Sequence, residues 1–181
     1  MALTSLFRGI RLSTVSKLAS AMPFILCGVL AFAQGQLSAK SLATKDSLIT
    51  MHAKGTFDVK VAPVAEDKAE GSTLGRYSLD KQYHGDLDAT AKGEMLTAGS
   101  DVKGSGAYVA LERVTGTLNG RRGSFVLVHK GTMDHGSMQL SVTVAPDSGT
   151  GQLAGLRGTL NIIIADGKHS YDFEYTIPDA R

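Results

Sequence analysis

Glu112 and His129 are the two side chains in this sequence whose types could do chemistry together, a carboxylate and an imidazole. Between them, the Asn-Gly dipeptide at 119–120 favours a tight hairpin turn in which both central residues take positive φ. Such a turn fixes a register that places Glu112 opposite Leu127 and His129 opposite Ala110. Glu112 and His129 are then diagonal neighbours on one face of the hairpin, within reach of each other.

The interior of the fold is where this pair could act. Tyr108 shares the face of Glu112 and His129, whereas Leu111 and Arg113 lie on the other face. Burial shifts the protonation equilibria of such groups and suits them to acid/base chemistry or to ligand binding. Both faces are mostly apolar, so the opposite arrangement, with Arg113 inside and Glu112 outside, stays open.

From this register we expect a ligand pocket with two polar anchors, Glu112 and His129. Tyr108, Phe125 and Tyr171 are predicted to form its apolar or aromatic wall. The alternative is a structural ion pair or hydrogen bond in which the two polar groups satisfy each other. The sequence assigns no catalytic residue, because a catalytic role needs a geometry that can be tested.

Metal and phosphate sites are not predicted. The five histidines contain no pair at a close ligand spacing, although convergence in space stays open. The glycine-rich segment 148–158 precedes a strand pattern, whereas glycine loops that bind nucleotides lie between a strand and a helix. We therefore interpret this segment as a connection between strands, and we expect no cofactor.

The elements that must position these residues are predicted to be strands. From residue 49 onward apolar and polar residues alternate, and Gly, Asn and Asp interrupt the runs at short intervals. The predicted strands are 50–61, 72–83, 86–96, 104–117, 123–132, 137–144, 159–165 and 169–177. The charged segment 63–71 is expected to be a mobile connection, and Asp-Gly at 166–167 predicts a second tight turn. We expect an all-β fold, an eight-stranded antiparallel closed barrel with room for side chains or one small ligand.

The N-terminal residues are expected to form an export signal. Three basic residues precede an apolar stretch at 22–33, which is shorter than the roughly 20 residues that span a bilayer. The stretch ends in Ala-Phe-Ala, so cleavage is predicted before Gln34, leaving no stable membrane span and a periplasmic or extracellular protein. An uncleaved anchor is the alternative. Residues 34–48 are expected to be a flexible lead-in to a single domain over 49–181.

Composition limits the partners of the mature chain. Cys27, the only cysteine, lies in the predicted signal at 1–33, so no disulfide is expected. Without the three basic residues of that signal, 16 basic residues remain against 17 acidic ones, a formal net charge of −1. A near-neutral chain with interspersed charges gives no electrostatic indication of binding to nucleic acid or to anionic membranes.

Several sequence blocks occur together in one order. They are HAKGTFDV at 52–59, ERVTGTL at 112–118, GSFVL at 123–127, SGTG at 148–151 and LAGLRG at 153–158. In these blocks the chain resembles the uncharacterised bacterial family catalogued as domain of unknown function 3224, over roughly residues 51–177. The resemblance implies an eight-stranded barrel similar to allene oxide cyclase, which binds an oxidised fatty acid in its lumen, but it implies no activity for this chain.

Three functions remain open on sequence grounds. The first is an exported barrel that binds a small hydrophobic molecule between Glu112 and His129. The second is an isomerase- or cyclase-like enzyme in which one of these residues acts as an acid or base. The third is a structural or interaction barrel whose lumen is filled by its own side chains. The sequence predicts neither the ligand nor the oligomeric state.

Overall fold

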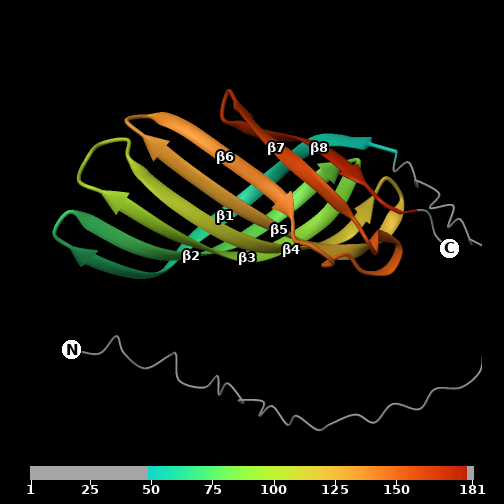
Figure 1. The fold of residues 1–181 in the computed structure, drawn as a ribbon, viewed down its shortest axis with the longest axis horizontal. Helices are drawn as coiled ribbons and strands as arrows, with labels where there is room; N and C mark the ends of the chain where they lie inside the picture. The colour runs from blue at the N-terminus through green and yellow to red at the C-terminus, as the bar shows by residue number, and fades with distance from the viewer. Residues whose placement is uncertain (1–48, 179–181) are drawn as a thin grey trace, which may run out of the picture. The chain divides into compact units, whose positions relative to one another are not determined.

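The computed structural model describes residues 49–178, which form an antiparallel barrel. Eight strands follow one another around it in chain order, and β1 pairs with β8 to complete the ring, as Figure 1 shows. The strands are β1 (Met51–Ala69), β2 (Ser72–Gly85), β3 (Leu87–Ser100), β4 (Gly106–Leu118), β5 (Arg121–Asp134), β6 (Ser137–Val144), β7 (Arg157–Ala165) and β8 (Lys168–Thr176). The predicted fold class is confirmed. The predicted export signal and the lead-in lie outside the described residues.

Two predicted turns have the expected backbone geometry. Asn119 and Gly120 have φ values of 47° and 78°, and Asp166 and Gly167 have φ values of 52° and 73°. The first turn gives the predicted register between β4 and β5, in which the two residues flanking the turn pair directly. Positive φ at two successive positions suits the right-handed twist of the flanking strands, which is why these dipeptides predicted the hairpins correctly.

The segment 63–71 corrects the prediction of a mobile connection. β1 continues to Ala69 and pairs with β2 down to Ser72, with a register shift between Pro63 and Ala65. Every residue of β1 after Val59 is exposed, so this end of β1 has solvent on both faces, although β2 beside it continues to pair with β3. A strand exposed on both faces needs no alternation of apolar and polar residues, and the sequence pattern therefore failed to indicate it.

One half of the barrel is packed solid, and we call it the closed half. It contains the β2–β3 and β4–β5 turns and the connection from β6 to β7. Phe125 stacks on Phe173 with ring centroids 5.8 Å apart, and Phe173 packs in turn against Tyr175. The glycine-rich connection contains the short 3-10 helix η1 (Gly151–Leu153) and buries Leu153 and Leu156 against this core. The segment considered for phosphate binding is therefore a connection that packs against the core.

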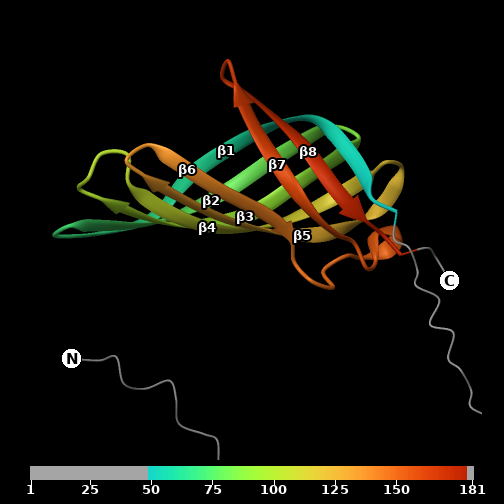
Figure 2. The same ribbon diagram turned by 45° about the horizontal axis from the view of Figure 1, so that its top comes forward.

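The other half, the open half, is a trough. β1 pairs with β8 only over its first six residues, Met51 to Thr56, and β6 pairs with β7 at the single pair Thr143 and Thr159. Beyond these points the β7–β8 hairpin turns away from β6, as Figure 2 shows. Strands β1 to β6 therefore continue into the open half without β7 and β8 completing the wall. Within residues 49–178, no helix has the length and apolar character needed to cross a membrane.

Candidate functional site

Glu112 and His129 are both buried in the barrel, on the face that the predicted register gave them. Glu112 lies opposite Leu127 and His129 lies opposite Ala110, as expected. The two side chains are 0% and 4% exposed, whereas Arg113 is exposed on the outer surface. The arrangement with Glu112 inside is therefore the one that the structure adopts. The His129 Nε2 atom lies 3.5 Å from Glu112 Oε1.

Two further residues, both from β2, contact the Glu112 carboxylate. The Tyr83 hydroxyl donates a 2.5 Å hydrogen bond to Oε1, and the Lys81 ammonium lies 2.7 Å from Oε2. Lys81 is 6% exposed, and its Nζ atom lies 5.0 Å from the centre of the Phe57 ring. The buried carboxylate thus has a cationic partner and a hydroxyl donor that the sequence analysis had not assigned to it.

Small residues on β3 let the β2 side chains reach Glu112. β3 lies between β2 and β4, and its inward positions at this level are Ala91, opposite Lys81, and Gly93, opposite Glu112. A Cβ atom at Gly93 would lie 2.2 Å from the Leu111 carbonyl oxygen and 2.9 Å from the Glu112 Cβ. Larger residues here would therefore fill the space through which Lys81 and Glu112 meet.

The electrostatics of the cluster keep Glu112 ionised. Burial alone would raise the pKa of Glu112, but the neighbouring His129 and Lys81 side chains outweigh burial and lower it to about 2. Burial, the negative charge of Glu112 and the hydrogen bond to it raise the pKa of the Tyr83 hydroxyl far above its ordinary value. Tyr83 therefore remains a donor and Glu112 remains an acceptor across the physiological pH range.

The His129 ring lacks a well-formed hydrogen bond at Nε2. This buried atom lies 3.5 Å from Glu112 Oε1, within ion-pair range, and makes no hydrogen bond of ordinary geometry among the described residues. The Oε2 atom of Glu112 also accepts no hydrogen bond of ordinary geometry, although the Lys81 ammonium lies close enough to it to form an ion pair. Buried polar groups without partners are uncommon in folded proteins, so the His129 nitrogen calls for an explanation.

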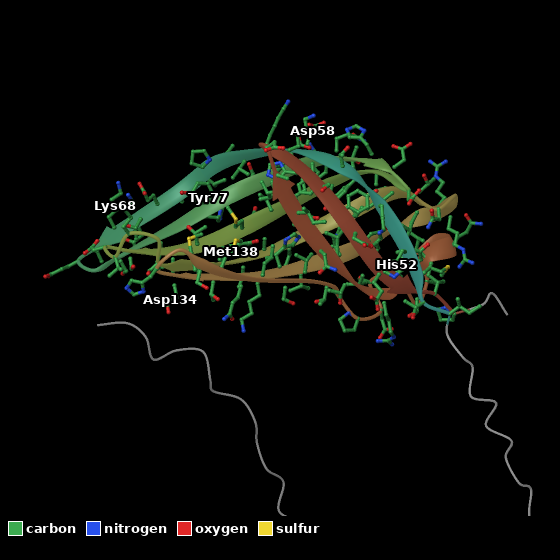
Figure 3. All side chains as sticks on the ribbon, turned by 90° about the horizontal axis from the view of Figure 1, so that it is seen from above. His52, Asp58, Lys68, Tyr77, Asp134 and Met138 are labelled. Atoms are coloured by element: carbon green, nitrogen blue, oxygen red, sulfur yellow. The ribbon has the colours of Figure 1, made fainter. Side chains whose placement is uncertain are left out.

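A cavity of about 150 Å³ lies beside His129 where the closed half meets the open half. Its lining is mainly apolar and includes Phe57, Leu79, Ala110, Leu140 and Ile162. The polar side chains in the lining are Lys81, Tyr108, His129 and His169. A second cavity of about 350 Å³ continues into the open half and shares Met95, Tyr108 and Met138 with the first. Figure 3 shows the barrel from above, with Met138 and Tyr77 in the open half and His52 toward the opposite end.

Of the three predicted wall residues, the structure brings only Tyr108 to the cavities. Its ring lies against Gly131, where a Cβ atom would come within 2.2 Å of the ring. Burial, and then the charge of Glu112, raise the pKa of the Tyr108 hydroxyl. Tyr108 thus combines an apolar ring with a protonated hydroxyl at the junction of the two cavities.

Phe125 and Tyr171 lie deeper in the barrel and line neither cavity. Phe125 belongs to the aromatic core of the closed half. The Tyr171 hydroxyl accepts a 3.0 Å hydrogen bond from the Leu87 amide and donates one of 3.1 Å to the His84 carbonyl. Tyr171 therefore fixes the β2–β3 turn, and burial raises the pKa of its hydroxyl.

Lys81 and Tyr83 were missed, although the sequence carried a signal for them. Both have the same parity along β2 as Leu79, which is buried. The alternation therefore placed a lysine on the inner face, where a charged residue is buried only with a partner. Among the described residues, no group of three or more His, Cys, Asp or Glu side chains could hold a metal ion.

Comparisons with known proteins agree with this fold. The family model described as protein of unknown function (DUF3224) matches residues 53–175. A crystal structure of a DUF3224 protein of unknown function from Shewanella oneidensis MR-1 is similar to this chain, with 46% sequence identity and a TM-score of 0.69. The match covers 73% of this chain and 100% of the Shewanella chain. No curated protein matches the sequence.

Proposed function

This chain belongs to the DUF3224 family, and we propose that it is an exported binding protein that holds a small, largely apolar molecule in its barrel. The observation that carries the proposal is the buried imidazole of His129, which lines an apolar cavity and makes no hydrogen bond of ordinary geometry at Nε2. A polar group of the bound molecule would lie beside this imidazole. The apolar remainder would lie against Met95 and Met138, whose flexible side chains adapt to different shapes.

The donors around the cavity favour a ligand whose polar group accepts hydrogen bonds. The Lys81 ammonium has three N–H donors, and the Tyr108 hydroxyl and the His129 ring can each donate one. The one carboxylate of the cluster, Glu112, already binds Tyr83 and Lys81. A carbonyl or carboxylate group therefore fits the cavity better than an ammonium group, which would face Lys81 at close range.

The low pKa of Glu112 argues against a role for this residue as a general base. A general base works best with a pKa near the working pH, whereas the pKa of Glu112 is lowered to about 2. The Glu112 carboxylate instead holds Tyr83 and Lys81 in place. The isomerase or cyclase hypothesis therefore has no support from this residue. A barrel filled throughout by its own side chains describes the closed half but not the open half, where the cavities lie.

Export is the second part of the proposal, and it rests on the N-terminal sequence. The basic residues, the short apolar stretch and the Ala-Phe-Ala sequence before Gln34 are features of a cleaved signal. An exported carrier would meet its ligand outside the cytoplasm, where a protein without disulfides depends on core packing for stability.

The test is native mass spectrometry of the protein purified from its own host, followed by identification of any retained small molecule. We expect a reproducible bound species that is lost in His129→Phe and in Lys81→Met. Lys92→Met and His52→Phe are matched controls, because both residues are exposed and lie outside the cavities. The fluorescent probe N-phenyl-1-naphthylamine provides a second readout. Decanoic acid should displace it more strongly than decylamine, and folded protein that binds neither a retained species nor the probe would overturn the proposal.

A further inference from the structure

The open half leaves long strand edges on β1 and β6 without a neighbouring strand, and β7 beyond Thr159 likewise pairs only with β8. β1 pairs with β8 as far as Thr56, so residues 57–69 pair only with β2. β6 pairs with β7 only at Thr143, so residues 137–142 pair only with β5. Unpaired edges present free N–H and C=O groups to other strands, and proteins usually protect them.

The edge of β1 carries the usual protection. It contains the charged residues Lys60, Glu66 and Lys68, and Pro63 cannot donate a hydrogen bond to a neighbouring strand. The register shift next to Pro63 further disturbs the edge. Charges, proline and an irregularity are devices that prevent pairing with another chain. This edge is therefore built to remain free.

The edge of β6 carries none of these devices. Residues 137–142 read Ser-Met-Gln-Leu-Ser-Val, with no charge, no proline and no register shift in the pairing with β5. Exposed apolar side chains flank it, because Met133 is 40%, Met138 is 51%, Ile163 is 51% and Ile164 is 63% exposed. The edges of β1 and β6 therefore differ, because the edge of β1 is protected and the edge of β6 is open to pairing.

We propose that β6 pairs with β6 of a second copy of this chain, antiparallel about a two-fold axis. A pairing centred on Leu140 places Met138 opposite the partner's Val142 and Gln139 opposite the partner's Ser141, so no charged residue of β6 faces another. A pairing of this kind has the closed symmetry common to protein dimers. A stable dimer buries about 800 Å² on each partner, which requires more than the strand alone. Met133, Ile163 and Ile164 supply exposed apolar surface beside it.

The experiment measures the mass of the full chain in solution by light scattering and sedimentation, from about 1 to 100 µM, because dimerisation depends on concentration. We expect twice the 19.0 kDa of the 181-residue chain, or the same doubling for the processed form. Gln139→Lys with Ser141→Lys should weaken the dimer about ten-fold or more, because like charges then face each other across the axis. Both residues are exposed, so the barrel itself should keep its melting temperature.

Two further variants make the test specific. Gln139→Lys with Ser141→Glu should restore the dimer, because each lysine then faces a glutamate of the partner. Ser78→Lys with Thr90→Lys is the control, because these exposed residues lie on strands that have neighbours on both sides. A monomeric wild type, or a dimer that survives the two lysines on β6, would overturn the proposal. Failure of the lysine–glutamate variant to dimerise would overturn the antiparallel register. None of these outcomes depends on ligand binding.

Discussion

The buried Glu112 carboxylate, whose pKa His129 and Lys81 lower, yields a prediction about stability and pH. The pKa of Glu112 is about 2 in the folded protein and 4.5 in its ordinary state, and this difference corresponds to about 3 kcal/mol. Because the folded pKa is the lower one, this stabilisation is present above pH 4.5. It is lost as the pH falls from about 4.5 to about 2.

The perturbation is Glu112→Gln, which removes the charge and leaves Lys81 buried without its counterion. We expect the free energy of unfolding at pH 6 to fall by about 3 kcal/mol, within the range measured when one partner of a buried pair is removed. For a domain of this size the melting temperature should fall by roughly 10 °C. Urea unfolding of wild type and variant at pH 6 and at pH 3 measures the difference, which should be clearly smaller at pH 3.

A matched control separates this pair from surface charges. Asp80 pairs with Lys92 on the outer surface, where the two side chains are 52% and 74% exposed. Asp80→Asn should change the free energy of unfolding by less than about 0.5 kcal/mol. The reasoning is refuted if Glu112→Gln loses equal stability at pH 6 and pH 3, or if it loses no more than Asp80→Asn. Replacing both members, by Glu112→Leu with Lys81→Met, should recover much of the loss because no unpaired charge remains.

Three further predictions follow from the turns and from the N-terminus. Gly120→Val should cost about 1–2 kcal/mol in unfolding experiments, because a β-branched residue is strained at φ 78°, whereas Gly99→Val, at a strand position with ordinary φ and open space, should be tolerated. Asp134→Ala, at an exposed hairpin end, should stay within about 0.5 kcal/mol of wild type, and a larger loss would indicate an unrecognised site there. The intact mass of protein secreted by its host should correspond to a chain that begins at Gln34, and a full-length mass would favour the uncleaved anchor.

Sequence reasoning succeeded where local rules determine structure. The Asn-Gly turn fixed the register of β4 against β5, and this register placed Glu112 and His129 together. The alternation along β8 likewise gives Tyr171, Phe173 and Tyr175 a common face, and all three are buried. In each case a single turn or strand contains all the residues on which the inference depends. The inference therefore needs no information about distant strands.

The depth of a residue along the barrel could not be predicted in this way. Alternation tells which residues face the lumen, but not how far each lies from either end. Tyr171 is placed relative to Glu112 by the registers of all the strands between β8 and β4, reached through β1, β2 and β3. Each of these registers sets how far one strand is displaced along its neighbour, so the height of a residue in the barrel depends on all of them together. Phe125 and Tyr171 are accordingly on the predicted face, but neither lines one of the two cavities.

The same physical reason explains why Lys81 was missed. Glu112 and Lys81 lie on strands that are not neighbours, so no hairpin register relates them. Their contact depends on the small residues of β3 between them, Ala91 and Gly93. Alternation along β3 gives Ala91 an inward position, but an ion pair across this intervening strand can be predicted only from the registers of two hairpins at once. When the alternation places a lysine at an inward position, the carboxylate that pairs with it should therefore be sought among the other inward residues.

The position of the ion pair relates stability to the proposed binding. Removing a charge pair from water costs free energy, and the attraction between the two charges offsets that cost only when their geometry is well fixed. Tyr83 and Phe57, which contact Glu112 and Lys81, belong to the core cluster that continues into the closed half. The cavity begins beside this cluster, where β7 and β8 no longer complete the wall. The closed half can therefore hold the donors rigidly while the open half, lined by Met95 and Met138, adapts to the molecule that enters.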